Sequence, residues 1–310
     1  MARVAFLFAG QGSQKPGMGK ALYDSSTAAH DLFDKVEAVR PGTIHQCFEG
    51  TAEELKQTIN TQPCVFTTDL ACAYAVQERG IVPETVAGHS LGEIAADTFS
   101  GIFTLEEGVS FVMERARLMQ QCSEEHPGAM RAVLKLNAQQ VEELAREAGD
   151  EAWPVNYNSP QQTVVAGSAE ACKKLDQLVK ETGGRSLPLK VSGAFHSPYM
   201  SEATAGLKAY LKDHAPHSPK IETYANYTGE SYDTDPEVIA HTVANQVSHP
   251  VKWTGELHAI RDAGIDTFIE VGPGHTLTGL VKRTLKDVAT YNVETVEQLD
   301  QVVAALRGDE

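Results

Sequence analysis

Short apolar runs alternate with helix-like segments through the first half of the chain. Val4–Ala9 predicts a buried strand, and Thr85–Ala87 predicts a second, shorter one. The helix-like segments around them are Ala52–Asn60, Cys64–Glu78, Ile94–Phe99 and Leu105–Cys122. Alternation of this kind predicts an α/β fold in which helices cover a parallel sheet.

The order of elements changes after Pro127-Gly128. Six segments follow in the order β-α-β-β-α-β: Ala129–Lys135, Ala138–Ala148, Ala152–Tyr157, Thr163–Ala166, Ala169–Thr182 and Arg185–Val191. This order is the ferredoxin-like unit. We therefore predict a large parallel-sheet domain of residues 1–126 and 192–310, with a ferredoxin-like subdomain inserted at 127–191.

The second part of the large domain repeats the alternation. Its predicted elements are helices at Pro236–Val247 and Val251–Ala263, a strand at Thr267–Val271, a helix at His275–Lys286 and a helical tail from Gln298 to Leu306. We find no internal repeat and no low-complexity linker.

Composition and charge exclude several classes of protein. Hydrophobic residues make up 42% of the 310 residues and charged residues 22%, which is typical of a globular protein. No run reaches the roughly 18–20 apolar residues that a membrane span needs, and Val4–Ala9 is too short for a signal-peptide core. The net charge of −16 disfavours nucleic acid as a partner. We expect a monomer that binds neither nucleic acid nor membrane.

The cysteines and histidines give no convincing metal or disulfide pattern. The five cysteines are odd in number, widely spaced and without a Cys-x-x-Cys pair, which fits a reducing cytoplasm. His214 and His217 have a metal-ligand spacing but no nearby third ligand. We expect no metal and no redox cofactor.

Gly88–Gly92 matches the pattern Gly-x-Ser-x-Gly. It follows apolar Val86-Ala87 and precedes the helical Ile94–Phe99, which is the strand–turn–helix setting of a nucleophilic serine. Glycines on both sides allow a sharp turn that exposes the hydroxyl of Ser90, and the Leu91 N–H would face a developing oxyanion. The alternative is an ordinary turn bounded by glycines.

A nucleophilic serine needs a base, and eleven histidines compete for that role. His89 is adjacent in sequence but points elsewhere on the turn. His196 lies where the chain re-enters the large domain, so a cleft between the domains would present it. The residues alone leave the choice open.

Arg115 lies between two apolar faces of the helix predicted over Leu105–Cys122, whereas Arg117 falls on the polar face. A buried guanidinium needs an anion. That anion is either a structural carboxylate, such as Glu93 or Glu270, or the carboxylate of a substrate.

Gly10–Gln14 forms a glycine-rich loop after the first strand. Lys15 occupies the place of the third glycine of a dinucleotide-binding loop, and the phosphate-binding loop pattern fails as well. The loop is therefore better suited to bringing backbone N–H groups close to a bound group.

Taken together, these motifs resemble the malonyl-CoA:acyl carrier protein transacylases of type II fatty acid synthesis. The matching segments run in family order over about residues 1–290: Phe8–Gln14, Gly88–Glu93, Arg115 with Met119-Gln120, Val155–Pro160, Phe195–Ser197, Gln246 with Pro250–Trp253, and Glu270–Gly274.

The resemblance implies a hydrolase-like α/β domain with a ferredoxin-like insertion. It also implies a role for each matched residue: Ser90 as nucleophile, His196 as base, the Gln11 and Leu91 N–H groups as oxyanion hole, Arg115 as ligand of the malonyl carboxylate, the Gln246 carbonyl as the group that orients His196, and Asn158 as a contact of the pantetheine or its thioester. Malonyl-CoA is then a substrate and needs no further cofactor, and acyl carrier protein is a transient partner.

Three alternatives stay open. Ala194 stands where the family often has proline, and Gly193–Met200 also looks like stand-alone acyltransferases that serve polyketide synthases. A serine hydrolase would use water instead of a thiol. A carrier-binding scaffold without chemistry would not need Ser90, His196 and Arg115.

For docking of an acidic carrier, the densest basic cluster beside a matched motif is Lys282, Arg283 and Lys286.

Overall fold

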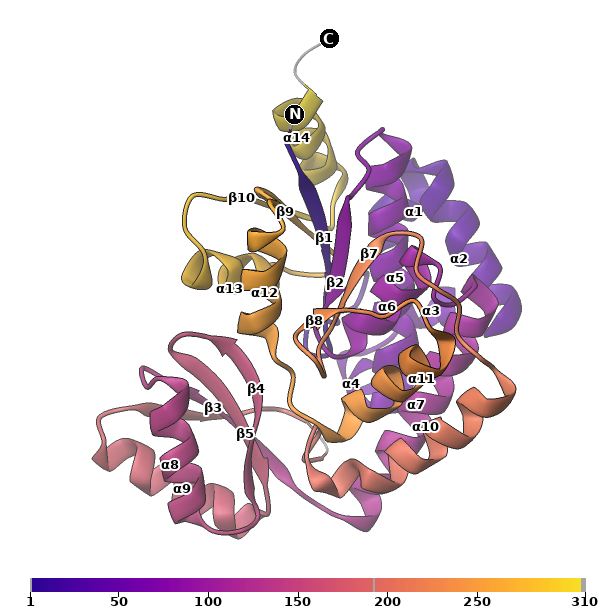
Figure 1. Ribbon diagram of the computed structural model, residues 1–310. Helices are drawn as coiled ribbons and strands as arrows, with labels where there is room; N and C mark the ends of the chain where they lie inside the picture. Colours follow the sequence, from indigo (N-terminus) through magenta and orange to yellow (C-terminus); the bar gives the residue numbers. More distant parts are fainter. Residues whose placement is uncertain (1, 192, 308–310) are drawn as a thin grey trace.

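The chain folds into two sheets of different character. The structure, a computed structural model, describes residues 2–191 and 193–307. Figure 1 shows a central sheet wrapped by helices and, at the end of the molecule away from α14, a smaller unit made of the middle of the chain. The predicted domain boundary at residue 192 lies outside the described residues.

The central sheet has six strands in the order β10-β9-β1-β2-β7-β8. The first five are parallel and β8 pairs antiparallel with β7. Their bounds are β1 Val4–Phe8, β2 Thr85–Gly88, β7 Glu222–Ala225, β8 Glu230–Ser231, β9 Thr267–Val271 and β10 Ala289–Val293. The predicted α/β fold with a parallel sheet is therefore confirmed.

Helices cover both faces of this sheet, so its central strands are apolar on both sides. Phe6 and Phe8 of β1 pack with the helices that precede and follow β2, and Ala5 and Leu7 pack on the opposite face. The helices on the first face are α1 Lys20–Ser25, α2 Thr27–Val39, α3 Thr43–Glu49, α4 Ala52–Lys56, α5 Thr58–Glu78, α6 Leu91–Ser100, α7 Leu105–Glu125 and α14 Val296–Arg307. Those on the opposite face are α12 Trp253–Asp262 and α13 Thr276–Thr284.

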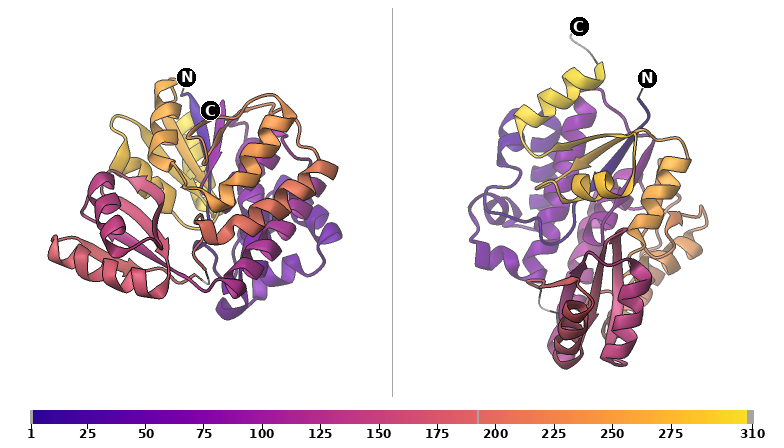
Figure 2. Two further views of the ribbon diagram at one scale, coloured as in Figure 1. Left: turned by 60° about the horizontal axis from the view of Figure 1, so that its bottom comes forward. Right: turned by 90° about the vertical axis from the view of Figure 1, so that its left-hand side faces the viewer.

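The inserted unit is an antiparallel sheet with strand order β4-β5-β3-β6. Its strands are β3 Ala129–Leu134, β4 Ala152–Ser159, β5 Gln162–Gly167 and β6 Arg185–Pro188, and its helices are α8 Ala138–Ala148 and α9 Ala169–Glu181. Both helices pack on one face around Val133, Val165 and Leu175. This order and connectivity match the ferredoxin-like unit, and Figure 2 shows it set beside the layers of the central sheet. The exact domain limits stay a prediction.

The chain returns to the large domain through η1 and α10. The remaining elements are η1 Pro198–Met200, α10 Ser201–Asp213, α11 Pro236–Asn245 and η2 Gln246–Ser248. Within residues 2–191 and 193–307, no helix combines the length and the apolar content that a membrane span requires.

Several predicted elements differ from those observed. The break expected between Asn60 and Cys64 is absent, because α5 runs unbroken from Thr58 to Glu78. A proline inside a helix removes one hydrogen bond, yet α5 continues through Pro63 because most of its residues are buried on all sides. The helices α1–α3 and α10 and the strands β7, β8 and β10 were not predicted, since their short or mixed apolar patterns give no clear period.

Candidate active site

The turn after β2 brings Ser90 to the carboxyl end of the central sheet. Gly88 and Gly92 are required there by close contacts: a Cβ on Gly88 would meet the backbone of Gly92 at 2.0 Å, and one on Gly92 would meet the carbonyl oxygen of Phe8 at 2.1 Å. Because neither glycine has a side chain, the turn can pack closely on itself and against the end of β1. This is the strand–turn–helix arrangement that the sequence predicted.

Ser90 adopts a backbone conformation that a residue with a side chain rarely accepts. Its φ is 56° and its ψ is −103°, and strain of this kind costs roughly 1–3 kcal/mol. The conformation exposes the hydroxyl, whose Oγ lies 2.7 Å from Nε2 of His196. A strained serine held against a histidine ring is the geometry of an activated nucleophile.

His196 is buried and held by backbone groups. Its Nδ1 lies 2.9 Å from the carbonyl oxygen of Gln246, and its own N–H donates to the Val247 carbonyl. Since a carbonyl only accepts, the proton sits on Nδ1 and Nε2 faces Ser90 as an acceptor. Burial, and then the charge of Arg115, lowers the pKa of His196 to about 3, so the ring is neutral at pH 7.

Arg115 contributes a buried positive charge beside the serine. Nη1 donates to Oε1 of Gln62 at 2.7 Å, while Nη2 donates to Oε1 of Gln246 at 2.8 Å and reaches Oγ of Ser90 at 3.3 Å. Its Nε has no partner among the described residues. Burial lowers the pKa of Arg115 to about 10, so the group stays charged at pH 7.

No carboxylate of the described residues forms an ion pair with Arg115. Glu93, one structural partner that the sequence allowed, accepts from Tyr232, Asn226 and Gln246 instead. Glu270, the other, accepts from the N–H groups of Leu277 and Thr278. A buried guanidinium whose hydrogen-bond partners are neutral is suited to bind an anion.

Two backbone N–H groups of the loops that meet at the nucleophile turn are candidate oxyanion donors. Gln11 follows β1, and its loop touches the nucleophile turn, since a Cβ on Gly10 would meet the His89 carbonyl at 2.6 Å. Among the described residues, neither the N–H of Gln11 nor that of Leu91 has a protein acceptor. Free N–H groups near a nucleophile are suited to stabilise a developing oxyanion.

Asn158 reaches the same turn, but its side chain contacts His89 and not Ser90. Its Oδ1 lies 2.8 Å from Nε2 of His89. Burial lowers the pKa of His89, so this ring is neutral too and donates through Nε2. His89 therefore points toward Asn158 of the inserted unit.

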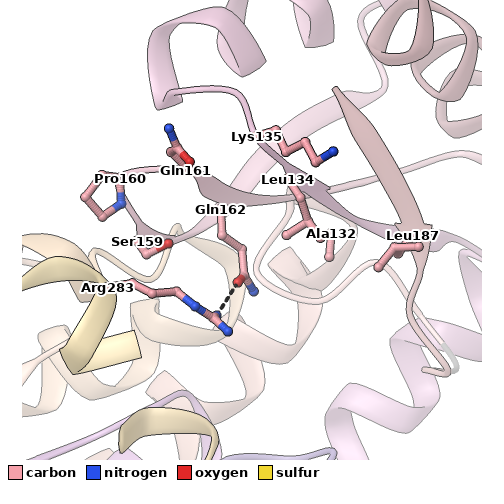
Figure 3. A pocket seen from close by; sticks show the side chains of 9 residues that line it. All are labelled: Ala132, Leu134, Lys135, Ser159, Pro160, Gln161, Gln162, Leu187 and Arg283. Atoms are coloured by element: carbon pink, nitrogen blue, oxygen red, sulfur yellow. Dashed lines mark hydrogen bonds between the residues drawn. The ribbon is translucent and has the colours of Figure 1, made fainter. Parts of the chain in front are cut away.

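A cavity leads from this turn to the surface between the two sheets. Its inner part, about 270 Å³, is lined by Gln11, His89, Asn158 and Gln162 among others. It shares Ala132 and Gln162 with an outer groove of about 750 Å³. Figure 3 shows this groove, with Lys135 on one side and Arg283 of α13 on the other.

The expectations on metal ligands are not tested by the structure. His214 and His217 are exposed, and they contact the Tyr210 carbonyl and Glu107. Glu125, His126 and Glu202, which the sequence analysis did not single out, bring exposed ligand atoms within 4.8 Å of one another.

Sequence reasoning missed two residues of the site. Gln62 holds Arg115 but fell in the predicted break between two helices. Asn226, whose Oδ1 accepts from the N–H of Ser90 at 2.7 Å, fell where no element was predicted. Neither gave a motif signal, because their importance depends only on which residues the fold places beside them.

Comparisons with known proteins agree with this geometry. The model of the acyl transferase domain family matches residues 5–302. The chain is 37% identical to the malonyl CoA-acyl carrier protein transacylase of Bacillus subtilis strain 168 over 96% of both chains. A crystal structure of the Clostridium perfringens malonyl CoA-acyl carrier protein transacylase superposes with a TM-score of 0.93 at 34% identity, covering 99% of this chain and 98% of that one.

A further solved structure contains a partner. It is a malonyl-transacylase in complex with its type II polyketide synthase acyl-carrier protein, with a TM-score of 0.94 and 31% identity, covering 99% of this chain and all of that one.

Proposed function

The chain belongs to the malonyl CoA-acyl carrier protein transacylases, and on that basis we propose that it moves a malonyl group from malonyl-CoA to the phosphopantetheine thiol of an acyl carrier protein through an ester on Ser90. The observation that carries the proposal is the contact of Ser90 with two different groups. Its Oγ lies 2.7 Å from a neutral histidine nitrogen and 3.3 Å from a buried arginine.

In the first half-reaction, Ser90 attacks the thioester carbon while Nε2 of His196 takes the hydroxyl proton. The negative charge that develops on the carbonyl oxygen is stabilised by the N–H groups of Gln11 and Leu91. When the intermediate collapses, the carbon–sulfur bond breaks and His196 returns its proton to the sulfur of coenzyme A. The malonyl group is then held on Ser90 as an ester.

In the second half-reaction, the thiol of the carrier repeats these steps in reverse. His196 takes the proton of the thiol, the sulfur attacks the ester, and the proton returns to Ser90 as the carbon–oxygen bond breaks. The Gln246 carbonyl, 2.9 Å from Nδ1, keeps the ring in the required tautomer and orientation. We propose a ping-pong cycle with a Ser-His pair, and this geometry supports it.

Arg115 is proposed to select malonate. Among the described residues, its direct hydrogen-bond partners are two amide oxygens and the serine hydroxyl, so a substrate carboxylate would be the first anion to contact it. The same contact offsets the charge that lowers the pKa of His196. Binding of malonyl-CoA therefore makes the base stronger at the step where it is needed.

The inner cavity and the outer groove together are the proposed path of the pantetheine arm, and Asn158 would contact the arm in the inner cavity. Lys282, Arg283 and Lys286 are exposed at and just after the end of α13, and Arg283 lines the outer groove (Figure 3). Arg283 reaches Gln162 of the inserted unit at 3.4 Å. We assign docking of an acidic carrier to this cluster, because complementary patches steer association even between proteins of like net charge.

The cellular setting follows from the substrates. A chain whose five cysteines are all buried and unpaired, and which acts on coenzyme A thioesters, is proposed to work in the cytoplasm as a monomer without metal. We propose that it supplies malonyl units for fatty acid chain extension. The polyketide alternative keeps its own support, because one structural neighbour was solved with a polyketide synthase carrier.

The direct test is the intact mass of the protein after it is mixed with malonyl-CoA. We expect the mass to rise by one malonyl group, and the added mass to be lost when holo carrier protein is supplied. Ser90→Ala should remain folded and show no adduct. Loss of the adduct to water at the same rate without carrier would favour the hydrolase, and an equal adduct on Ser90→Ala would refute the assignment of Ser90.

A further inference from the structure

Asn226 packs against the backbone of the nucleophile turn, where it contacts Gly88 and Ser90. It follows β7 directly, its side chain is fully buried, and it is not among the residues that line the cavity. We propose that Asn226 is a positioning residue: its side-chain amide holds the backbone of Ser90 in the strained conformation that catalysis needs. This inference rests on the proposed role of Ser90.

The amide of Asn226 binds two backbone groups of the turn at once. Its Oδ1 accepts the N–H of Ser90 at 2.7 Å, and its Nδ2 donates to the carbonyl of Gly88 at 2.8 Å. One side chain therefore spans the two peptide groups that enter the turn. An amide is suited to this task, because it carries a donor and an acceptor in a fixed plane.

The amide is itself held by buried partners. Nδ2 also donates to Oε1 of Glu256 at 2.9 Å, and the backbone N–H of Asn226 donates to Oε2 of Glu93 at 2.9 Å. Glu93 in turn accepts from Nε2 of Gln246, which donates to the carbonyl of Ser90 at 2.7 Å. Both sides of the Ser90 residue are thus fixed by one connected network.

This arrangement has a consequence for the oxyanion site. Because the Ser90 N–H is bound to Asn226, it points away from the substrate and cannot serve as an oxyanion donor. The N–H of Leu91, the next residue, is left free to do so. Asn226 therefore determines at once where the hydroxyl points and which peptide N–H faces the reacting carbonyl.

The test is the rate at which malonyl-CoA acylates the enzyme in a single turnover. In Asn226→Ala, the turn loses both of its amide contacts, and a displacement of the reacting atoms by about 1 Å can slow a reaction by about 100-fold. We expect the acylation rate constant to fall by about 10–100-fold. The final amount of adduct per mole of total enzyme should stay the same.

The rate constant and the amplitude separate positioning from general stability. A variant that is merely less stable has fewer active molecules, so the amplitude falls while the rate constant is unchanged. A misplaced serine instead lowers the rate constant and leaves the amplitude unchanged. The affinity for malonyl-CoA, measured in the Ser90→Ala background with and without Asn226→Ala, should differ by less than about two-fold, since the interaction acts on the reacting atom.

Two further variants keep the test decisive. Thr223→Val is the matched control: Thr223 is buried on β7, the strand that precedes Asn226, and among the described residues its hydroxyl donates only to the carbonyl of Ile221, so the acylation rate constant should be unchanged. If Asn226→Ala does not fold, Asn226→Asp replaces it. Its carboxylate keeps an acceptor for Ser90 but has no proton to donate to Gly88, and it should also slow acylation by about 10-fold or more.

A wild-type rate constant in the folded Asn226 variant, or a loss of amplitude alone, would overturn the inference. The proposed function fails in a different way, namely when the wild-type protein forms no malonyl adduct at all. The two failures are therefore distinguishable in one set of measurements.

Discussion

The Nη2 atom of Arg115 lies 3.3 Å from the Oγ atom of Ser90, so a permanent positive charge and the nucleophile share one buried site. Arg115 also lowers the pKa of His196, as the second cause after burial. One side chain therefore acts on both the nucleophile and the base. This coupling makes the site's chemistry depend on whether the bound acyl group carries its own negative charge.

Arg115→Ala should reduce acylation by malonyl-CoA far more than acylation by acetyl-CoA, because only malonate offers a carboxylate to the guanidinium. A charge-assisted hydrogen bond in a desolvated site contributes about 1.5–3 kcal/mol, or roughly 10–150-fold in rate. The measurement is kcat/KM with each donor. Arg117→Ala is the control, since Arg117 is exposed and pairs with Glu114. Equal losses with both donors would make Arg115 a structural residue.

The pH profile of acylation should lack the acid limb of an ordinary histidine. A base works only when it is unprotonated, and the pKa of His196 in the free enzyme is about 3 instead of 6.5. We expect kcat/KM with acetyl-CoA, which leaves Arg115 unpaired, to stay flat from pH 8 down to about pH 5. In Arg115→Ala the pKa of His196 should rise, so any fall of kcat/KM at low pH should begin at a higher pH. A wild-type limb centred near 6.5 would contradict this.

Asp69→Asn should stabilise the protein at neutral pH. Asp69 is buried in α5, and neither of its carboxyl oxygens has a partner among the described residues. Burial, and then Glu270, raises its pKa well above 3.8. The folded state therefore keeps a proton that the unfolded state loses, and the carboxyl costs stability as the pH rises from about 4 toward the folded-state pKa.

The gain from Asp69→Asn should therefore be small at pH 4 and reach about 1–3 kcal/mol at pH 7–8. Thermal unfolding at both pH values measures it. Asp24→Asn is the control, because Asp24 is exposed and pairs with Lys20. A gain that is the same at pH 4 and pH 8 would show that ionisation of Asp69 is not its cause.

Reversal of Lys282 and Arg283 to Glu should raise the apparent KM for the carrier, more strongly at low salt, because the attraction is screened over about 10 Å at 0.1 M salt. Acylation by malonyl-CoA should change little. The alternative is that these cations only complement the C-terminal dipole of α13. That role predicts a small loss of stability and no kinetic defect specific to the carrier.

The matched control for this reversal is Lys20→Glu with Lys35→Glu. These residues are exposed on α1 and α2, on the side of the molecule away from the inserted unit (Figure 1). The control changes the net charge by the same amount. If both double variants raise KM for the carrier equally, net charge alone is responsible and α13 is not the docking site.

Local pattern was enough to predict the α/β fold, the β-α-β-β-α-β unit and the turn that carries Ser90. Each of these depends on residues close in sequence: apolar periods define strands and helices, and two glycines four residues apart define a sharp turn. The helices before Ala52 and the strand β7 were missed because their apolar residues follow no single period. Tertiary burial, and not local propensity, forms these elements.

The sequence by itself therefore determined which groups are available: a serine on a glycine-bounded turn, an arginine set into an apolar helix face, and a family resemblance that named His196 and Gln246. Only the tertiary structure decided how they meet. His196 is 106 residues from Ser90 and Asn226 is 136, and both touch it. Contacts over such separations depend on how the parallel sheet and the inserted unit pack. No local pattern encodes a distance between side chains on different elements, so the amide that holds Ser90 became visible only in the fold.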